Sequence, residues 1–248
     1  MLYHKGLTLV AFILITGLNF LYSQTESVSN KFSKEDIIDL AEKKYGLDDL
    51  LINGGKYRPK DIRVNGNLFF EWAESTDTKL FIKGQTYFNT KLKYDINSDR
   101  LVLTTVTKDS YEHLIVLNSS LVDSFYLGHH IFINMNQQKE NSNQKGYFEK
   151  INSGNDILLK KYTKTIISLY DDYNPNGKYS SQKYTYFIYN HKDFVKVSSK
   201  KAFLKFYETY RKEIGKFMKQ NEIVYKSASN EELIKLMTFC HAKSTQAN

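Results

Sequence analysis

The chain has one cysteine among its 248 residues, Cys240. A single cysteine cannot form an internal disulfide, so the fold must be stable without one. Leu233, Leu236 and Met237 precede Cys240 at helical spacing. This spacing predicts that Cys240 is a small buried apolar residue and not a reactive thiol.

The sequence also lacks the common catalytic motifs. It has no Gly-x-Ser-x-Gly, no His-Glu-x-x-His and no glycine-rich phosphate loop. Serine hydrolase, zinc protease and nucleotide chemistry therefore have no support, and we expect no cofactor. The net charge is +8, but only four of the 35 basic residues are arginine. Arginine is the residue that most often binds phosphate and guanine with two hydrogen bonds. The positive charge therefore does not predict a nucleic-acid partner.

There is only one long apolar run, at residues 7–22 (LTLVAFILITGLNFLY). Lys5 precedes it and the small Ser23 follows it, which is typical of a removable signal peptide spanning residues 1–23. The alternative is a retained anchor, but 16 residues fall short of the roughly 20 that span a bilayer as a helix. The next residue is Gln24 and not cysteine, which argues against a lipoprotein. We expect a periplasmic or secreted protein with no transmembrane segment after cleavage.

After a flexible lead-in at residues 24–32, we expect one strand-rich domain at residues 33–248. Ser33 and Asp36 form a candidate capping box for a helix that ends near Gly46. Two helices are expected near the end of the chain, at residues 200–220 and 230–241. Ser199 caps the first, and Ser229 with Glu232 caps the second.

Between these helices the apolar residues alternate with a period of two. Residues 88–96 are typical of a strand that buries Leu92, Tyr94 and Ile96 and exposes Lys91, Lys93 and Asp95. A hairpin turn at residues 97–99 leads to a strand at residues 101–106. Further strands are expected at residues 68–72, 79–83, 111–117, 122–127, 131–135, 147–151, 157–162, 165–170, 183–189 and 194–197. The pattern predicts a mainly β (α+β) fold, an antiparallel meander forming a curved sheet, half-barrel or sandwich, with the helices packed on it.

The expected helix at residues 200–220 carries a regular apolar stripe, which should bury against the strand region because a patch of several hundred Å² is rarely left exposed. Its members are Phe203, Phe206, Tyr207, Tyr210, Ile214, Phe217 and Met218.

Four short segments carry a resemblance to a family. They are residues 51–57 (LINGGKY), 91–96 (KLKYDI), 158–162 (LLKKY) and 194–201 (FVKVSSKK). In this order they resemble a group of uncharacterised exported strand-rich proteins of Gram-negative Bacteroidota. The resemblance implies an exported protein. It implies no catalytic residues, because the group has no established activity.

Two weak metal candidates have oxygen-bearing residues at alternate positions. Asp172, Asn174 and Asn176, followed by Gly177, resemble the opening of a calcium loop, but Lys183 occupies the position of the closing glutamate. A hairpin turn explains the same residues. The second candidate, Asp95, Asn97 and Asp99, has Arg100 where a calcium loop needs glycine, and a turn is again the preferred interpretation.

Histidines and acids supply the remaining candidates. His129 and His130 are adjacent, so on a strand they face opposite ways and cannot easily bind one ion. A hydrolase with a non-local site would need a cleft that brings together residues such as Glu71, Glu74, His113, His129 and His130.

The sequence therefore favours an exported envelope protein, most simply a non-enzymatic binding or structural module. Its partner would be an envelope protein, a glycan or a lipid. The alternatives are a periplasmic lipid or lipoprotein carrier with a half-open barrel, and a hydrolase. An open apolar pocket of roughly 300–1,000 Å³ would favour the carrier.

Overall fold

A computed structural model describes residues 48–60, 62–71, 78–106, 111–137, 145–167, 172–190 and 193–245. All of them belong to one compact unit, Leu47–Asn248. The predicted signal peptide, lead-in and helix at residues 33–46 lie outside these ranges, as do Trp72 and Glu74. No helix of the described residues is long and apolar enough to cross a membrane.

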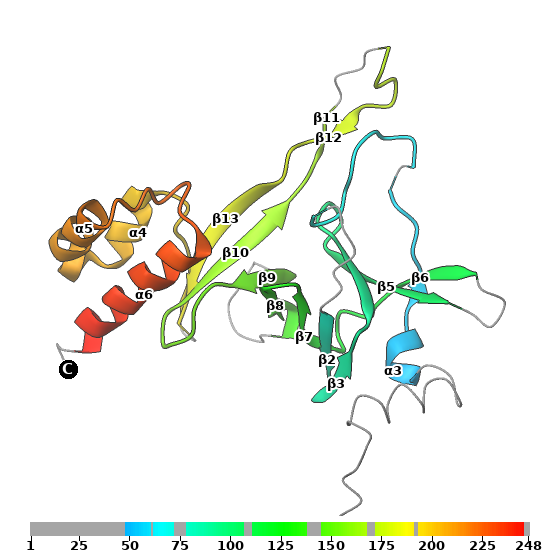
Figure 1. Cartoon of the computed structure of the whole chain (residues 1–248), viewed down its shortest axis with the longest axis horizontal. Coiled ribbons are helices and arrows are strands. Elements are labelled where there is room, and N and C mark those ends of the chain that lie inside the picture. Colours follow the sequence, from blue (N-terminus) through cyan, green and yellow to red (C-terminus); the bar gives the residue numbers. More distant parts are fainter. Residues whose placement is uncertain are drawn as a thin grey trace, which may run out of the picture. The chain divides into compact units, whose positions relative to one another are not determined.

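The strands of this unit form two main antiparallel sheets (Figure 1), which confirms the predicted mainly β fold. The smaller sheet has the order β1-β6-β5-β4, from strands Gly55–Lys56, Glu112–Val116, Arg100–Val106 and Lys91–Asp95. The larger sheet has the order β14-β13-β10-β9-β8-β7-β2-β3. Its strands are Phe194–Lys196, Lys183–Tyr189, Ile157–Thr163, Tyr147–Lys150, His130–Asn134, Val122–Leu127, Thr78–Ile82 and Gln85–Phe88.

The remaining described elements are short or helical. Strands β11 (Ile166–Ile167) and β12 (Lys178–Tyr179) pair in a two-stranded ribbon. Helix α3 covers Asp49–Ile52, and two 3₁₀ turns cover Met135–Gln137 and Glu208–Tyr210. Helices α4, α5 and α6 cover Lys200–Phe206, Arg211–Gln220 and Asn230–Thr245, and Figure 1 shows them gathered beside the ends of β10 and β13.

The strand predicted at residues 88–96 is wrong in its extent. Asn89 adopts a left-handed conformation (φ +53°) and separates β3, in the larger sheet, from β4, in the smaller one. Within β4 the prediction holds for Leu92 and Tyr94, which are buried. Asp95 was expected to face solvent but is 2% exposed, because it caps the following turn and accepts a hydrogen bond from Tyr57 Oη at 3.0 Å.

Two other predicted strands are only partly covered by the described residues. Residues 68–71 form no strand, and Phe69 makes an isolated bridge with Asp95. Within the predicted strand at residues 165–170, Ile166 and Ile167 form β11, and residues 168–170 lie outside the described residues. The chain is also not a simple meander, because it leaves the larger sheet after β3, builds β4, β5 and β6, and returns with β7 beside β2.

The helix predicted at residues 200–220 is interrupted at Tyr207. This residue leaves the helical conformation (φ −99°, ψ 47°), and its hydroxyl donates to Asp156 Oδ2 at 2.9 Å. Both predicted caps are confirmed. Ser199 Oγ accepts from Ala202 N, while Ser229 and Glu232 exchange side chain-to-backbone hydrogen bonds as a capping box. The final helix continues beyond the expected residue 241 to Thr245.

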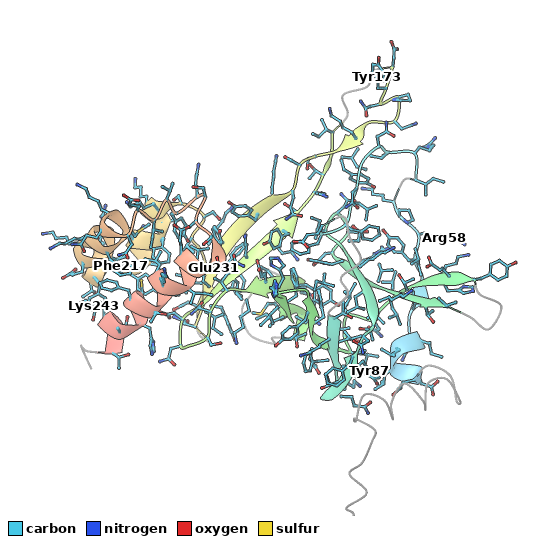
Figure 2. All side chains as sticks on the ribbon, viewed as in Figure 1. Arg58, Tyr87, Tyr173, Phe217, Glu231 and Lys243 are labelled. Atoms are coloured by element: carbon cyan, nitrogen blue, oxygen red, sulfur yellow. The ribbon has the colours of Figure 1, made fainter. Side chains whose placement is uncertain are left out.

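The apolar stripe of α4 and α5 is buried against the strands, as predicted. Phe203 and Ile214 share one core cluster with Leu158 and Ile188 of β10 and β13. Phe217 of α5, which is labelled in Figure 2, stacks on Phe239 of α6 with ring centroids 4.2 Å apart. A separate aromatic cluster, which includes Phe125 and Phe132, fills the space between β4–β5 and the other end of the larger sheet.

Cys240 is fully buried in the helical cluster, which confirms its predicted apolar role. Burial, reinforced by the nearby Asp156 carboxylate, raises the pKa of the thiol to about 12. The thiol is therefore protonated and unreactive near neutral pH.

Candidate functional site: a groove of mixed polarity and the polar cluster beneath it

A groove with a volume of about 590 Å³ lies on one face of the larger sheet, where α6 forms a wall. Its lining comes from β2, β7, β8, β9, the turn after β9, and α6. The lining residues are Phe81, Ser124, Tyr126, Ile131, Ile133, Lys150, Ile151, Asn152, Ser153, Ile234 and Thr238.

Strand alternation explains why these side chains face the groove. Phe81 pairs across the sheet with Ser124, which pairs with Ile133, and Tyr126 pairs with Ile131. Cross-strand partners point to the same face, so the two rows form one floor. The residues between them, such as Phe125 and Phe132, point the other way into the aromatic cluster.

The groove is chemically asymmetric. Apolar side chains on its floor and helix wall, those of Phe81, Tyr126, Ile131, Ile133 and Ile234, lie beside the polar Ser124 and Thr238. Polar groups gather at the turn between β9 and β10, where Lys150, Asn152 and Ser153 line it.

The turn at this polar end has a defined geometry. Asn152 Nδ2 donates to Asp156 O at 2.9 Å, and Asn152 Oδ1 accepts from Leu158 N at 2.7 Å. These two bonds close the turn through one side chain. The polar end of the groove is therefore held in place by its own hydrogen bonds.

On the opposite face of the same strands lies a polar cluster around Glu149, which is only 1% exposed. Glu149 Oε1 accepts from His130 Nδ1 at 2.5 Å and from Asn230 Nδ2 at 2.8 Å. Glu149 Oε2 accepts from Tyr162 Oη at 2.7 Å and lies 3.9 Å from Lys160 Nζ. Because an ionised carboxylate can only accept, the His130 ring must carry its proton on Nδ1 in this contact.

The pKa values of Glu149 and His130 are shifted in opposite directions. Burial alone would raise the pKa of Glu149, but the hydrogen bonds from His130 and Tyr162 outweigh it and leave the pKa lowered. The hydrogen bond to Glu149 raises the pKa of His130 against the opposing effect of burial, and the charge of Glu71 adds to the rise. His130 Nε2 lies 3.3 Å from Glu71 Oε1, so carboxylates flank both ring nitrogens.

Lys160 is held among aromatic rings beside this cluster. Its Nζ lies 5.1 Å, 4.6 Å and 5.9 Å from the ring centres of Tyr162, Tyr184 and Tyr186. Burial lowers the pKa of Lys160, and the Glu149 carboxylate partly offsets this. Cation–π contacts and the carboxylate together stabilise a half-buried ammonium group.

The cluster and the groove share one element, α6. Asn230 is the first residue of α6 and binds Glu149, while Ile234 and Thr238 of the same helix line the groove. The Glu149 cluster therefore fixes the start of the helix that forms the groove wall.

Among the predicted catalytic candidates, the structure brings Glu71 and His130 together. His129 is exposed, and His113 lies on β6 in the smaller sheet, also exposed. Glu74 lies outside the described residues. Sequence reasoning missed Glu149, Lys160, Tyr162 and Asn230. One signal for Glu149 was available, since it is an acid within the largely apolar run of residues 147–151 (YFEKI).

The predicted calcium-loop residues form a turn at the end of the β11–β12 ribbon. Asn174 Oδ1 accepts from Asn65 Nδ2 at 3.1 Å, and Gly177 N donates to Asn174 O at 2.9 Å. Gly177 has φ +81°, a conformation that favours glycine. Asp172 and Asn176 lie in the same segment, where Tyr173 is 86% exposed at the tip (Figure 2).

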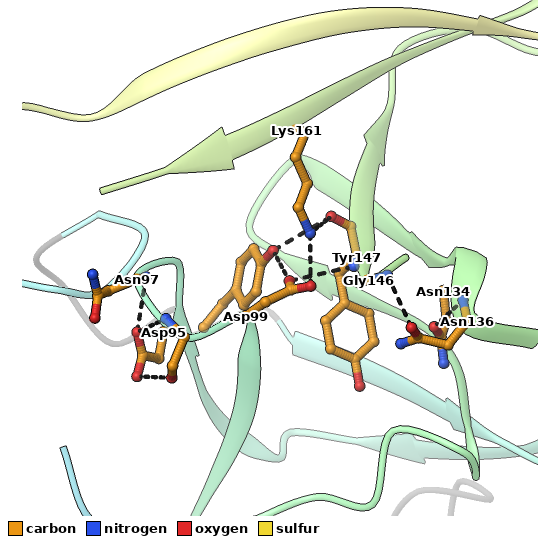
Figure 3. A network of polar contacts seen from close by, with 10 residues as sticks. Asp95, Asn97, Asp99, Asn134, Asn136, Gly146, Tyr147 and Lys161 are labelled. Carbon is orange, nitrogen blue, oxygen red and sulfur yellow. Dashed lines mark hydrogen bonds and ion pairs between the residues drawn. The ribbon is translucent and has the colours of Figure 1, made fainter. Parts of the chain in front are cut away.

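The second predicted set also serves a turn, within the network in Figure 3. Asp95 Oδ1 accepts from the backbone N–H groups of Asn97 and Ser98. Asp99 pairs with Lys161 Nζ at 2.7 Å and accepts from Tyr94 Oη at 2.6 Å. Since Lys161 belongs to β10, this network joins the β4–β5 turn to the larger sheet.

In the described part of the chain, no group of three or more His, Cys, Asp or Glu residues has a geometry that could hold a metal ion. Comparison with protein-family models, with curated proteins and with solved structures finds no match for this chain. The site must therefore be interpreted from its own chemistry.

Proposed function

We propose that this protein is an exported, non-enzymatic binding module that holds a single-chain amphiphile, such as a fatty acid, in the groove under α6. The observation that carries the proposal is the groove itself. Its volume of about 590 Å³ falls within the range of roughly 300–1,000 Å³ that is usual for small-molecule sites. The signal peptide expected at residues 1–23 supports export.

The lining favours an amphiphile over a glycan. Glycan sites use several aromatic faces and many hydrogen-bonding groups, whereas four isoleucines, Ile131, Ile133, Ile151 and Ile234, line this groove beside two aromatic residues, Phe81 and Tyr126. Such side chains suit an acyl chain through apolar burial. Lys150 and Ser153 at one end can receive an acidic or hydrogen-bonding head group, whereas both Nδ2 hydrogens of Asn152 are donated within the turn.

Replacing Ile234 by glutamate should weaken binding of a fatty acid at least about tenfold, a loss of ~1.4 kcal/mol. The new carboxylate would lie in the apolar wall, lose hydration when the chain binds, and repel an acidic head group. Ile234 is 43% exposed, so the substitution should not prevent folding. The measurement is displacement of a fluorescent fatty acid by unlabelled hexadecanoate.

The matched control is Val224→Glu, which places the same charge on an aliphatic residue that is 63% exposed and outside the groove lining. This variant should bind like the wild type. Equal affinity of the wild type and the Ile234→Glu variant, or no displaceable binding by either protein, would contradict the proposed function.

A further inference from the structure

Helix α5 carries a stripe of three lysines on the side opposite its buried face. Lys212, Lys216 and Lys219 are spaced at i, i+4 and i+7, and all three are exposed. Ile214 and Met218, on the other side, are buried in the helical core cluster. From this arrangement we propose that the lysine stripe of α5 is a docking surface for an anionic phospholipid bilayer.

The charge around the stripe is strongly one-sided. The segment 200–220 contains seven cationic residues and two anionic residues, for a net charge of +5, whereas the whole chain carries +8. All seven cationic residues are exposed; they are Lys200, Lys201, Lys205, Arg211, Lys212, Lys216 and Lys219. The described ion pair of this segment joins Arg211 to Glu208 at 3.5 Å and lies outside the stripe.

The form of the surface favours association with a bilayer surface and not insertion into it. The apolar residues of α5 already pack inside the protein, with Phe217 stacked on Phe239 of α6. The helix therefore has no free apolar face to bury among acyl chains. What remains outside is a row of ammonium groups, which anionic lipid head groups attract through charge alone.

The same surface is poorly suited to nucleic acid. Arg211 is the one arginine of segment 200–220, and lysine acts as a point charge without the planar fork that reads phosphates and bases. Phe206, Tyr210 and Phe217 pack against the helical core cluster, so they form no stacking platform for bases. A lysine stripe binds through charge alone. It therefore suits the diffuse negative charge of a lipid surface better than the ordered phosphates of a nucleic acid.

The test is co-sedimentation of the protein with vesicles of phosphatidylglycerol and phosphatidylcholine, compared with vesicles of phosphatidylcholine alone. We expect binding to the anionic vesicles that weakens with added salt. The triple variant Lys212→Gln, Lys216→Gln, Lys219→Gln should bind about a hundredfold more weakly, since each lysine near an anionic membrane contributes roughly fivefold.

The control is the triple variant Lys56→Gln, Lys83→Gln, Lys91→Gln, which removes the same net charge from exposed lysines of β1, the β2–β3 turn and β4. It should lose far less affinity. An equal loss in both triple variants, no binding to anionic vesicles, or tighter binding to duplex DNA than to those vesicles would overturn the proposal. Vesicle binding and fatty-acid displacement are separate measurements, so a failure here leaves the test of the groove intact.

Discussion

Replacing Phe203 by alanine should lower the free energy of unfolding by about 3–5 kcal/mol, because the change leaves a large cavity in a packed core. Phe203 is fully buried, and its ring lies 5.2 Å from that of Tyr207 and 5.0 Å from that of Tyr225. The same cluster includes Leu158 and Ile188 from the strands. The strand and helix signals should therefore move together to lower denaturant concentration.

The comparison variant is Phe206→Ala. Phe206 lies on the same helix but is only partly buried at the edge of the cluster. Its replacement by alanine should therefore lower the free energy of unfolding by less than Phe203→Ala does. In the sequence, Phe203 and Phe206 are equivalent members of the predicted apolar stripe, because periodicity does not distinguish the centre of a stripe from its margin. Loss of the helix signal alone in Phe203→Ala, with the sheet transition unmoved, would show that the helices fold independently of the sheet.

Replacing Glu149 by glutamine should also cost about 3–5 kcal/mol, since it removes one partner of a buried charged network. His130, Lys160, Tyr162 and Asn230 all direct polar groups at this carboxylate. An amide cannot accept from all of them, and Lys160 would lose its neighbouring negative charge. Denaturant unfolding of the variant measures the loss, and stability within 1 kcal/mol of the wild type would show that the network contributes little.

The pH dependence of stability provides a second measurement of this network. The pKa of His130 is raised in the folded protein, so its contribution is fully present below the unfolded value of about 6.5 and is lost as the pH rises through the folded pKa. The pKa of Glu149 is lowered, so its contribution is present above its unfolded value and is lost as the pH falls through the folded pKa. The wild type should therefore lose stability as the pH rises above about 6.5.

The matched control for this effect is the neighbouring His129, which is exposed. The His129→Gln variant should keep the alkaline loss of stability, and the Glu149→Gln variant should show much less of it. If the loss persists unchanged in Glu149→Gln, some other group causes it.

The strands were largely predictable because alternation is a local property. Residues 122–127 and 183–189 have the predicted bounds, and Leu92 and Tyr94 face the core as expected. The assignment of strands to sheets was not predictable. It depends on the left-handed conformation of Asn89 and on the pairing of β7 with β2. Neither feature can be recognised from the alternation of apolar and polar residues in the sequence.

The candidate site was less predictable than the fold. Glu71 and His130 were suspected separately, but Glu149 connects His130, Tyr162 and Asn230, which lie on β8, β10 and α6. The break in the predicted helix at residues 200–220 has a similar origin, because Tyr207 bonds Asp156 in a distant turn. Contacts between residues far apart in sequence determine these features, and local patterns do not record them.

The central claim, that the groove under α6 binds the apolar chain of an amphiphile, is tested most directly by NMR on protein with isotope-labelled isoleucine methyl groups. On addition of hexadecanoate, the methyl signals of the groove isoleucines should shift and show contacts to the chain protons of the ligand; they are Ile131, Ile133, Ile151 and Ile234. Signals of the fully buried Ile82, Ile188 and Ile214, which lie outside the groove, should not change. Ligand contacts to methyl groups elsewhere, or no contacts to the four groove isoleucines at saturating ligand, would contradict the account.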